Sequence, residues 1–326
     1  MISFRFMSFF LLTIPILAMG QDSIQVGIGP EDMVLDTLMG KERLIISCND
    51  WRREGSQPGI WEYDFKTEKV KQLTVVFPTN EFTLRPHGVH LTRGHLFVVN
   101  HPKAEDPINK GKKKKDIIKQ EILRFRVMGD SLVLETAYRH KHIKAPNDVF
   151  AISSSEFYWT NFKIFGGNVC KFKDGVIEKV HKKGRMHNGL QLINVKVEGT
   201  DSVKPYMISS TILGSHVYRT ELFGKGKTKN VGKVKGGDNF SITKDGTLLL
   251  TGHAQVGNMS NYRDRKIDKI PSNVFELDLT KNDDVQTNIY TNDGSVISAC
   301  TTAIRYKGFL YMSPLYDSYI IKTKIK

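Results

Sequence analysis

The sequence predicts an all-β fold, a six-bladed β-propeller, from three observations. Short strand-like runs alternate with turn signals along the whole chain. One sequence motif recurs. In it, a polar residue precedes an apolar run, a turn follows, and a second apolar run completes a hairpin. Its markers lie at irregular intervals of 55, 60, 41, 51 and 63 residues, which is typical of propeller blades with variable loops. The markers are Asp32, His87, Asn147, Asn188, Asn239 and Thr302.

The copies of the motif are, in chain order, Glu31-Asp32-Met33-Val34, His87-Gly88-Val89, Asn147-Asp148-Val149-Phe150, Asn188-Gly189-Leu190, Asp238-Asn239-Phe240-Ser241 and Thr302-Ala303-Ile304-Arg305. The second strands of these hairpins are expected at 43–48, 95–99, 156–160, 248–251 and 309–313. Because blades are arranged radially, residues that begin equivalent inner strands point toward one end of a central channel. Five copies are therefore expected to share one site, and the copy at Thr302 is expected to be chemically silent.

Length and composition favour one domain. The chain has 326 residues, 40% of them hydrophobic, and all-β domains often reach this size. Residues 1–20 carry one charge, Arg5, an apolar stretch at 9–17, and the small-residue signal Ala18-Met19-Gly20. We expect 1–20 to be a signal peptide or leader and 21–326 to be a single propeller domain of an exported protein, secreted or periplasmic. An uncleaved leader that anchors the protein in a membrane is the alternative.

The formal net charge is +14, and much of it lies in one segment. This segment contains Lys103, Lys110, Lys112, Lys113, Lys114, Lys115 and Lys119. Such a run is typical of a solvated loop, and the Lys112–Lys115 loop is also suited to bind anionic lipid headgroups or other polyanions. No aromatic residues alternate with the lysines, so we do not expect nucleic acid as a partner. The sequence does not indicate the oligomeric state.

Five of the recurring side chains could bind one metal ion. They are Glu31, Asn147, Asn188, Asp238 and Asn239. All of them offer oxygen, and this donor set favours calcium, which accepts six to eight oxygens, over zinc. Taken singly, each residue is more often a turn former that hydrogen-bonds its own backbone. Their recurrence at the same point of each hairpin favours the shared site.

Asp32 and Asp148 each follow a candidate ligand directly. Because successive strand residues face opposite ways, both carboxylates could reach a second, deeper cation. The alternative is that both accept backbone hydrogen bonds in loops, and the residues alone do not decide between the two.

Histidines near the channel mouth supply candidate proton acceptors. His87 opens the second copy, and His101 ends the second strand of the same hairpin, so the two could meet as a base and a relay. His253 ends the equivalent strand of the Asp238 copy and is expected to line the substrate pocket. The sequence contains no G-x-S-x-G, H-E-x-x-H or Walker A motif, which disfavours serine hydrolases, zincins and P-loop enzymes.

In this order, the motifs resemble those of the paraoxonase and arylesterase family. The resemblance rests on Glu31-Asp32, Pro86-His87-Gly88, Val98-Val99-Asn100-His101-Pro102, Asn147-Asp148, Asn188-Gly189, Asp238-Asn239-x-Ser241 and Gly252-His253. It implies a six-bladed propeller with two calcium ions in its central tunnel. It also implies a catalytic calcium on the five oxygen ligands and a structural calcium on Asp32, Asp148 and the backbone carbonyl of Val89. His87 and His101 match the family's histidine dyad, and His253 matches a pocket histidine.

The same resemblance implies a hydrolase of lactones and aryl esters that acts promiscuously on phosphotriesters. A calcium ion would polarise the carbonyl, while His87 takes a proton from water and His101 passes it on. Glu31 or Asp238 is an alternative base. The chain departs from the animal members because neither end contains a cysteine for the disulfide that closes their propeller, so strand pairing alone must close this one. The lysine-rich insertion and the 49–60 segment also differ, so substrate preference is not carried over.

Two other functions remain open. A gluconolactonase-like propeller would share the tunnel metal but lack the histidine dyad. A non-catalytic secreted propeller would use the same calcium as a structural ion. Replacing His87 while calcium is retained distinguishes the first alternative, and testing ester turnover before and after chelation distinguishes the second.

Overall fold

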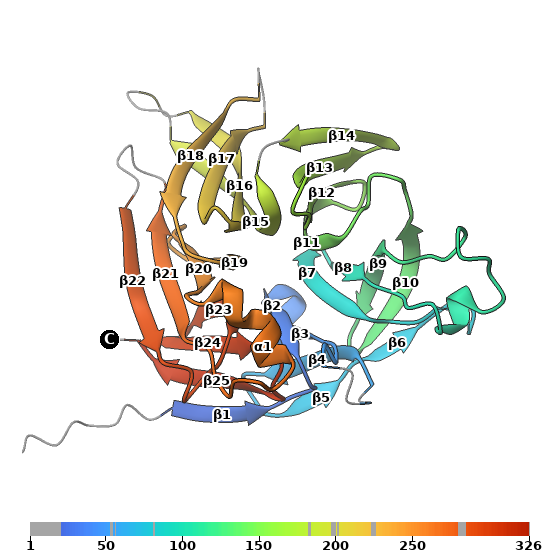
Figure 1. Ribbon diagram of the computed structural model, residues 1–326, viewed down its shortest axis with the longest axis horizontal. Coiled ribbons are helices and arrows are strands. Elements are labelled where there is room, and N and C mark those ends of the chain that lie inside the picture. Colours follow the sequence, from blue (N-terminus) through green and yellow to red (C-terminus); the bar gives the residue numbers. More distant parts are fainter. Residues whose placement is uncertain are drawn as a thin grey trace, which may run out of the picture.

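The computed structural model describes residues 21–325, apart from 53–54, 56, 81, 182–183, 197–199, 201, 223–225 and 280–284. Six sheets stand around a central axis as the blades of a propeller (Figure 1). The predicted six-bladed β-propeller is thereby confirmed. The predicted signal peptide at 1–20 lies outside the described residues.

Each blade has a strand beside the axis and further strands toward the rim. From inside outward, the first three blades are β2 (Pro30–Asp36), β3 (Arg43–Cys48), β4 (Gly59–Asp64) and β5 (Val70–Gln72); β7 (Pro86–Thr92), β8 (His95–Asn100), β9 (Glu121–Met128), β10 (Ser131–Tyr138) and β6 (Thr74–Val76); and β11 (Pro146–Ser153), β12 (Glu156–Asn161), β13 (Asn168–Lys173) and β14 (Val176–His181). The last three are β15 (Arg185–Lys196), β16 (Val203–Leu213), β17 (His216–Glu221) and β18 (Thr228–Lys233); β19 (Gly237–Ile242), β20 (Leu248–His253), β21 (Ser272–Asp278) and β22 (Val285–Asn292); and β23 (Cys300–Tyr306), β24 (Phe309–Pro314), β25 (Tyr319–Lys324) and β1 (Gln21–Gln25).

Helical segments are short and lie in loops. They are η1 (Leu38–Gly40), η2 (Pro107–Asn109), η3 (Val256–Asn258) and α1 (Met259–Arg263). Across the described ranges, no helix has the length and apolar character needed to cross a membrane.

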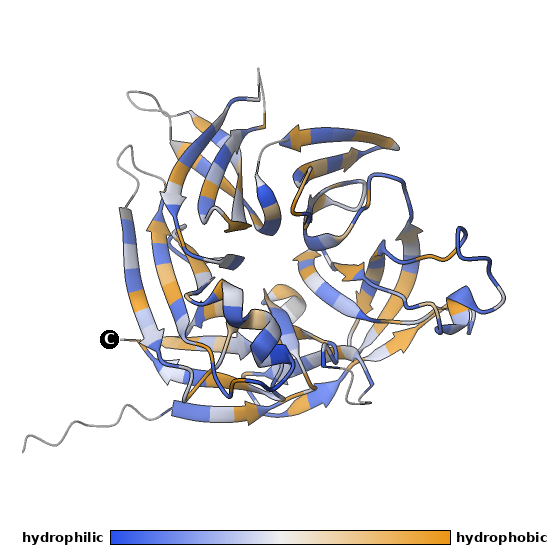
Figure 2. Ribbon diagram, in the orientation of Figure 1, coloured by the Kyte–Doolittle hydropathy of each residue, from blue (hydrophilic) through white to orange (hydrophobic). Residues whose placement is uncertain are grey.

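Hydrophobic clusters between neighbouring blades hold the ring together. The second strand of blade 1 shows how: Leu44 and Ile46 pack toward blade 6, whereas Ile45 between them packs toward blade 2. Side chains alternate across a strand, so an uninterrupted apolar run buries both of its faces when blades lie on both sides. Figure 2 shows these apolar stretches along the strands of every blade. The apolar second strands therefore provide the packing from which the inner strands project their polar residues.

The ring closes by strand pairing. The first described strand, β1, pairs antiparallel with β25, from Gln21 opposite Thr323 to Gln25 opposite Tyr319. Strands from both ends of the described chain thus complete blade 6, as expected for a propeller without the closing disulfide. The three cysteines, Cys48, Cys170 and Cys300, are buried and unpaired.

Every inner strand is irregular at its marker. The register with the second strand shifts between the pairs Pro30/Asp32, Pro86/Val89, Pro146/Val149, His187/Leu190, Gly237/Phe240 and Cys300/Thr302. The recurring motif therefore coincides with a β-bulge in each blade. Bulges bend a strand and change the direction of its side chains. A residue with positive φ directly precedes four of these strands, namely Gly29, Ala145, Gly236 and Ala299, and Met186, the second residue of β15, also has positive φ. The polar markers therefore sit where the backbone turns toward the axis.

Candidate functional site

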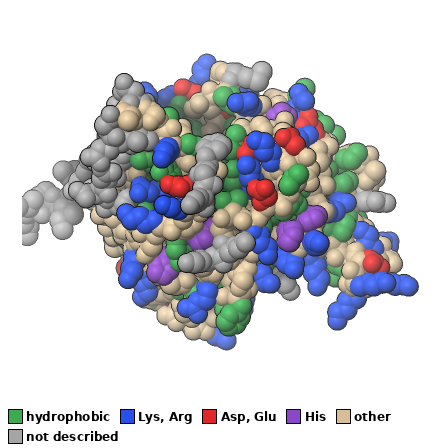
Figure 3. Space-filling model, turned by 90° about the horizontal axis from the view of Figure 1, so that it is seen from above, with side chains coloured by type: hydrophobic (Ala, Val, Ile, Leu, Met, Phe, Trp, Pro, Cys, Tyr) green, Lys and Arg blue, Asp and Glu red, His purple; other side chains and the backbone are tan. Residues whose placement is uncertain are grey.

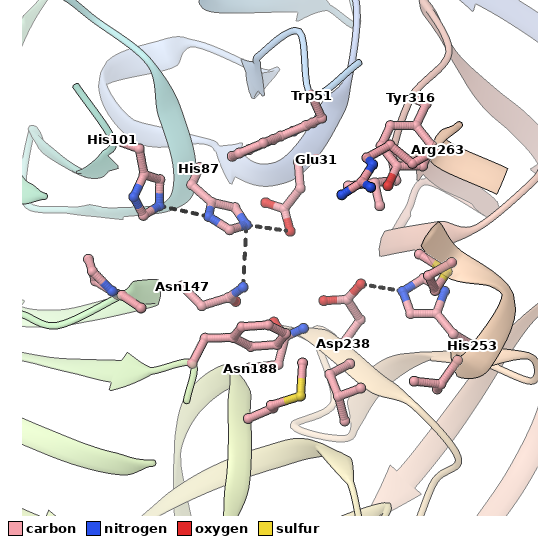
Figure 4. Close-up of a pocket in the computed structure, with 18 of the residues that line it drawn as sticks. Glu31, Trp51, His87, His101, Asn147, Asn188, Asp238, His253, Arg263 and Tyr316 are labelled. Atoms are coloured by element: carbon pink, nitrogen blue, oxygen red, sulfur yellow. Dashed lines mark hydrogen bonds and ion pairs between the residues drawn. The ribbon is translucent and has the colours of Figure 1, made fainter. Parts of the chain in front are cut away.

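A cavity of about 510 Å³ lies at the end of the channel where the inner strands begin. Four of the five candidate ligands line its floor, namely Glu31, Asn147, Asn188 and Asp238 (Figure 4). The fifth, Asn239, follows Asp238 and donates a hydrogen bond to Glu31. The structure thus brings together side chains from blades 1, 3, 4 and 5, and all five are at least 95% buried.

Each of the five side chains presents one buried oxygen that has no hydrogen-bond partner. These atoms are Glu31 Oε2, Asn147 Oδ1, Asn188 Oδ1, Asp238 Oδ1 and Asn239 Oδ1. An unsatisfied buried polar oxygen costs roughly 1–3 kcal/mol, so five of them in one place require an explanation. We refer to this set as the oxygen ring.

The remaining polar atoms of the ring are mostly tied to neighbours, and this orients the free oxygens. Asn147 Nδ2 donates to His87 Nε2 at 3.3 Å, and Asn239 Nδ2 donates to Glu31 Oε1 at 3.2 Å. Asp238 accepts from His253 Nε2 through Oδ2 at 2.6 Å, which leaves Oδ1 free. Partners of this kind fix ligands around metal ions in general. For these three residues, the hydrogen bonds determine which oxygen faces the others.

A hard cation fits this donor set. It comprises two carboxylates and three amide carbonyls and contains neither sulfur nor imidazole, which suits calcium better than zinc. In the described residues, no cluster of three or more His, Cys, Asp or Glu side chains could hold a metal. A site on the oxygen ring would therefore depend on its asparagines.

Burial of the ring carboxylates is electrostatically unfavourable without a cation. Burial raises the pKa of Asp238, and the contact with His253 opposes this shift. Glu31 raises the pKa of Asp238 further because it is a like charge close by. The cation that would satisfy the free oxygens would also relieve this repulsion.

The two predicted histidines meet at the edge of the ring. His87 Nδ1 lies 3.0 Å from His101 Nε2, and burial lowers the pKa of His101 to about 3, which keeps it neutral. The carbonyl of Pro146 is a hydrogen-bond partner of His101, so the remaining ring nitrogen, Nδ1, is the donor to it and Nε2 is an acceptor. His87 then donates through Nδ1, and its Nε2 holds a lone pair toward the pocket.

The pocket-side nitrogen of His87 has a partner for either protonation state. Asn147 Nδ2 can donate to it when it is neutral, and Glu31 Oε1, at 3.2 Å, can accept from it when it is protonated. The arrangement is therefore suited to accept a proton from a group in the cavity. The predicted pocket histidine, His253, lies on the other side of the floor beside Asp238 (Figure 4).

Asp32 and Asp148, which we call the aspartate pair, do not line the cavity, and all four of their oxygens accept hydrogen bonds. Asp32 accepts from the amides of Met33 and Val89 and from the hydroxyl of Thr302. Asp148 accepts from the amides of Val149 and Leu190. Burial raises the pKa of both carboxyls, and Asp148 raises that of Asp32 further. The backbone hydrogen bonds foreseen as one alternative are present, and several of them join neighbouring blades.

Two residues contribute in ways that the sequence did not indicate. Trp51 packs on His87 with ring centroids 4.7 Å apart and also borders His101. It follows the second strand of blade 1, just as His101 follows that of blade 2, and this correspondence is the signal that could have found it. Thr302, expected to be silent, donates to Asp32 and lies 3.2 Å from Asn239 Nδ2.

The wall of the cavity is largely apolar. Its apolar members are Trp51, Ala145, Pro146, Phe162, Met186, Ile212, Val256, Met259, Leu315 and Tyr316. Arg263, at the end of α1, also lines the cavity (Figure 4). A polar floor under an apolar wall is typical of a site for a small organic molecule.

Comparison with known proteins gives one family and one fold. The Arylesterase family model matches residues 55–320. Serum paraoxonase/arylesterase 2 of Bos taurus is 24% identical over 280 residues, which cover 79% of this chain and 74% of the relative. Serum paraoxonase/lactonase 3 of Oryctolagus cuniculus is 22% identical over 276 residues, or 77% and 72% of the two chains.

Solved structures share the propeller fold at low identity. Regucalcin from Agrobacterium tumefaciens, a calcium-binding protein, is 10% identical with a TM-score of 0.57 and covers 93% of each chain. A gluconolactonase from Xanthomonas campestris is 11% identical with a TM-score of 0.52 and covers 95% of this chain and 99% of its own. At such identities, the likeness concerns the fold alone.

Proposed function

This chain belongs to the arylesterase family, and on that premise we propose that it is a calcium-dependent hydrolase of lactones and aryl esters. The relatives are named as paraoxonases, arylesterases and lactonases, and all of these names describe hydrolases. The proposed substrate is accordingly a small ester or lactone, and the apolar wall of the cavity suits the hydrocarbon part of such a molecule.

One observation carries the proposal: five buried oxygens from four blades lack hydrogen-bond partners within one site. A calcium ion is the simplest ligand that satisfies several oxygens at once. The calcium-binding regucalcin, which shares the fold, is consistent with this choice. The five residues Glu31, Asn147, Asn188, Asp238 and Asn239 would hold the catalytic ion.

We propose a second, structural calcium at the aspartate pair, with the backbone carbonyl of Val89 as a further ligand. The support is electrostatic. Asp32 and Asp148 are both buried; Asp148 raises the pKa of Asp32 as a nearby like charge, and Glu31 and Asp238 raise that of Asp148 in the same way. Their hydrogen bonds to backbone amides do not use every lone pair, because each carboxylate oxygen can accept more than one partner.

In the proposed reaction, the bound calcium would polarise the carbonyl and stabilise the negative charge that develops on its oxygen. His87 takes a proton from the attacking water at Nε2, and the resulting N–H donates to Glu31 Oε1. His101 accepts the hydrogen bond from His87 Nδ1 and so holds this tautomer, and the proton taken up at His87 Nε2 passes to the leaving oxygen as the ester C–O bond breaks. Trp51 holds the His87 ring in this orientation by packing against it. His253 fixes Asp238 and borders the substrate.

The dyad also separates this proposal from the gluconolactonase-like alternative, which lacks it. The 3.0 Å contact between His87 and His101 gives a base with a neutral acceptor behind it. Glu31 and Asp238 are less suited as bases because each would also hold the ion.

We propose that the protein is exported, secreted or periplasmic. Two lines of support are the leader-like composition of residues 1–20 and the name "serum" carried by the relatives. Anchoring through an uncleaved leader is the second arrangement, and N-terminal sequencing of the protein recovered from its cell separates the two.

The test measures turnover and calcium binding in parallel. The full chain is assayed with phenyl acetate and a long-chain lactone, before and after chelation and after calcium is restored. Calcium affinity is measured by titration calorimetry. Hydrolysis should disappear on chelation and return with calcium. His87→Gln should lower kcat by about 100-fold or more while calcium affinity stays within about twofold, since general-base catalysis is worth that much.

His95→Gln is the matched control, since His95 pairs with Glu135 away from the cavity. It should change neither quantity. Tight calcium binding without hydrolysis of any ester or lactone would favour the non-catalytic propeller instead. Full activity in His87→Gln would remove the dyad from the mechanism.

A further inference from the structure

Arg263 is the one Lys or Arg side chain that lines the cavity among the residues that the structure describes. It ends α1, and its guanidinium lies beside Tyr316 (Figure 4). In the same view, Glu31 lies between Arg263 and His87, so the guanidinium is across the floor from the proposed base. The side chain is 51% exposed, which places it where the cavity opens to solvent. The proposed hydrolysis takes place at the oxygen ring and the histidines and gives this charge no role.

The segment that presents Arg263 packs against Arg52, which comes from blade 1. The Arg52 guanidinium contacts the rings of Tyr262 and Tyr316, at 4.8 and 4.7 Å from their centroids, and such cation–π contacts are attractive. Arg52 Nη2 also donates to the carbonyl of Tyr262 at 3.2 Å. Tyr262 itself is buried in an apolar cluster that includes Met259, the first residue of α1. Arg263 therefore projects from a wall of defined shape.

Most donors of the Arg263 guanidinium are available to a ligand. Nε donates to the carboxylate of Asp264 at 2.9 Å, whereas Nη1 and Nη2 have no hydrogen-bond partner in the described part of the chain. Asp264 is 39% exposed, so water competes for this ion pair. A guanidinium has five N–H donors in a planar fork, and two parallel donors on one edge match a carboxylate. The edge formed by the two Nη groups can therefore bind a second carboxylate.

The loops around the mouth of the cavity are positively charged. Those of blades 2 and 3 at this end comprise residues 101–120, 139–145 and 162–167 and contain eleven Lys and Arg against three Asp and Glu. The 254–271 segment, which includes Arg263, contains four against two. Figure 3 shows Lys and Arg gathered on the projecting corner at the right of that view. A positive mouth raises the local concentration of anions and speeds their association.

We propose that the substrate is an ester or lactone that carries a carboxylate, and that Arg263 is the residue that selects it. This inference rests on the proposed function, because it names the substrate class of that site. The carbonyl to be hydrolysed would lie over the oxygen ring, an apolar spacer would pack on the wall, and the carboxylate would accept two hydrogen bonds from Arg263. A phosphate monoester fits less well, because its second charge needs a further cationic donor and Arg263 is the single one in the described lining.

The experiment compares acids with their methyl esters, which have similar shape but no charge. The acids are para-acetoxybenzoate and para-acetoxyphenylpropanoate, whose carboxylates lie at two different distances from the acetyl carbonyl. Release of the phenol by the full chain in calcium gives kcat and KM. In Arg263→Gln, KM for at least one acid should rise about 10-fold with kcat unchanged, the loss expected for a half-exposed hydrogen-bonded charge. KM for both methyl esters should change by less than about twofold.

Three further variants separate a specific contact from general charge. Arg263→Lys keeps the charge without the planar fork and should raise KM for the same acid about threefold. Asp264→Asn removes the carboxylate that competes for Arg263, so this KM should fall about twofold. Lys266→Gln is the matched control, because it removes one charge from the same loop at a side chain that is 67% exposed and does not line the cavity. It should change no KM, and thermal unfolding checks that all variants are folded.

Binding without turnover is measured separately. In para-acetamidobenzoate and para-acetamidophenylpropanoate, an amide replaces the ester to be cleaved, and titration calorimetry gives their affinities and those of their methyl esters. The affinity of at least one acid should fall about 10-fold in Arg263→Gln, and those of the methyl esters should not. If no ester is hydrolysed at all, the proposed function fails, while this measurement still decides whether Arg263 selects a carboxylate.

Three results would overturn the inference. Equal rises in KM for an acid and its methyl ester would make Arg263 a support of the cavity wall only. Unchanged KM and affinity for both acids in Arg263→Gln would mean that the guanidinium stays in solvent. An equal effect in Lys266→Gln would assign the preference to the general positive charge of the mouth. In each case, hydrolysis of the methyl esters would leave the proposed activity untouched.

Discussion

The oxygen ring and the aspartate pair share two bulged strands, β2 and β11, yet their side-chain oxygens differ in whether they accept hydrogen bonds. Glu31 Oε2 and its four counterparts have no protein partner. One residue further along two of these strands, every oxygen of Asp32 and Asp148 accepts a hydrogen bond. The five unpartnered oxygens of the ring are available to bind an ion that the protein takes up. The satisfied atoms join blade to blade and are part of the fold before any ligand arrives.

This difference teaches that burial of a carboxylate does not by itself identify a ligand. Burial raises the pKa of Asp148 and Asp238 alike. What separates them is whether the oxygens already have donors. The comparison therefore makes distinct predictions for ion binding and for stability.

The largest effect is expected from Glu31→Gln, which removes a ring carboxylate. Calcium affinity should fall at least about 100-fold and phenyl acetate hydrolysis about 1,000-fold, the loss typical of removing a group that supports transition-state charge. Stability without calcium should change little, because Oε2 has no partner to lose. Titration calorimetry, initial rates and urea unfolding measure the three quantities. Glu105→Gln, at an exposed position, is the control, and unchanged calcium affinity in Glu31→Gln would remove Glu31 from the site.

Asp148→Asn should act on the fold instead. Asparagine keeps one acceptor oxygen, so the amide of Val149 or Leu190 loses its partner, which costs about 1–3 kcal/mol. Urea unfolding should show this loss with chelator and a larger one with calcium, because the variant would also weaken the proposed structural calcium site. Asp116→Asn, at an exposed position in the lysine-rich segment, should show none. A loss confined to the calcium-loaded protein would mean that the aspartate pair acts chiefly as an ion site.

Thr302→Val tests the link between the oxygen ring and the aspartate pair. It should lower the free energy of unfolding by about 1 kcal/mol. The hydroxyl of Thr302 donates to Asp32 and lies 3.2 Å from Asn239 Nδ2, so its removal should weaken the fold by one hydrogen bond. Calcium affinity should fall by less than about tenfold, because Asn239 keeps its bond to Glu31. The exposed Thr287→Val provides the baseline. A larger effect on calcium than on stability would place Thr302 with the ring.

The smallest expected effect is on the pH dependence of stability below neutral pH. The pKa of His101 is lowered to about 3 by burial, so the unfolded chain takes up this proton more readily than the folded one. Its contribution to stability is therefore present above the ordinary value of 6.5 and is lost as the pH falls from there toward about 3. Between about pH 7.5 and 6 the loss should stay below about 1 kcal/mol. Parallel unfolding of the parent and His101→Gln checks the sign, and a steeper decline in the variant would contradict it.

Much of the site could be predicted because it repeats. Asn147, Asn188 and Asn239 are ordinary turn formers one at a time, but their equal position in successive hairpins marks the channel end. The bulges behind this regularity have no separate sequence signal, because the register of two strands depends on where the backbone can bend. The residues thus indicated which side chains meet but not how each is held.

The missed contacts depend on loops that meet only in space. Trp51 reaches His87 from a neighbouring blade, and the only signal for it in the chain is its place after the second strand of blade 1, which corresponds to that of His101 in blade 2. The lysine-rich segment at 103–119 was expected to be a solvated loop, and Lys112–Lys115 are exposed. The hydrogen bonds of Asn109 and Asp106 that hold this segment join residues whose types give no signal in the sequence. Thr302 has no ligand chemistry of its own, so only its neighbours give it a role.

The pairing of β1 with β25 has a consequence for synthesis. Gln21 and Thr323 lie side by side although almost the whole chain separates them. The ribosome synthesises β1 long before β25. Until β25 emerges, β1 has no pairing partner and the propeller ring stays open. Contacts of such long range form slowly, so the incomplete propeller is the stage at which chaperones would be most needed to prevent aggregation.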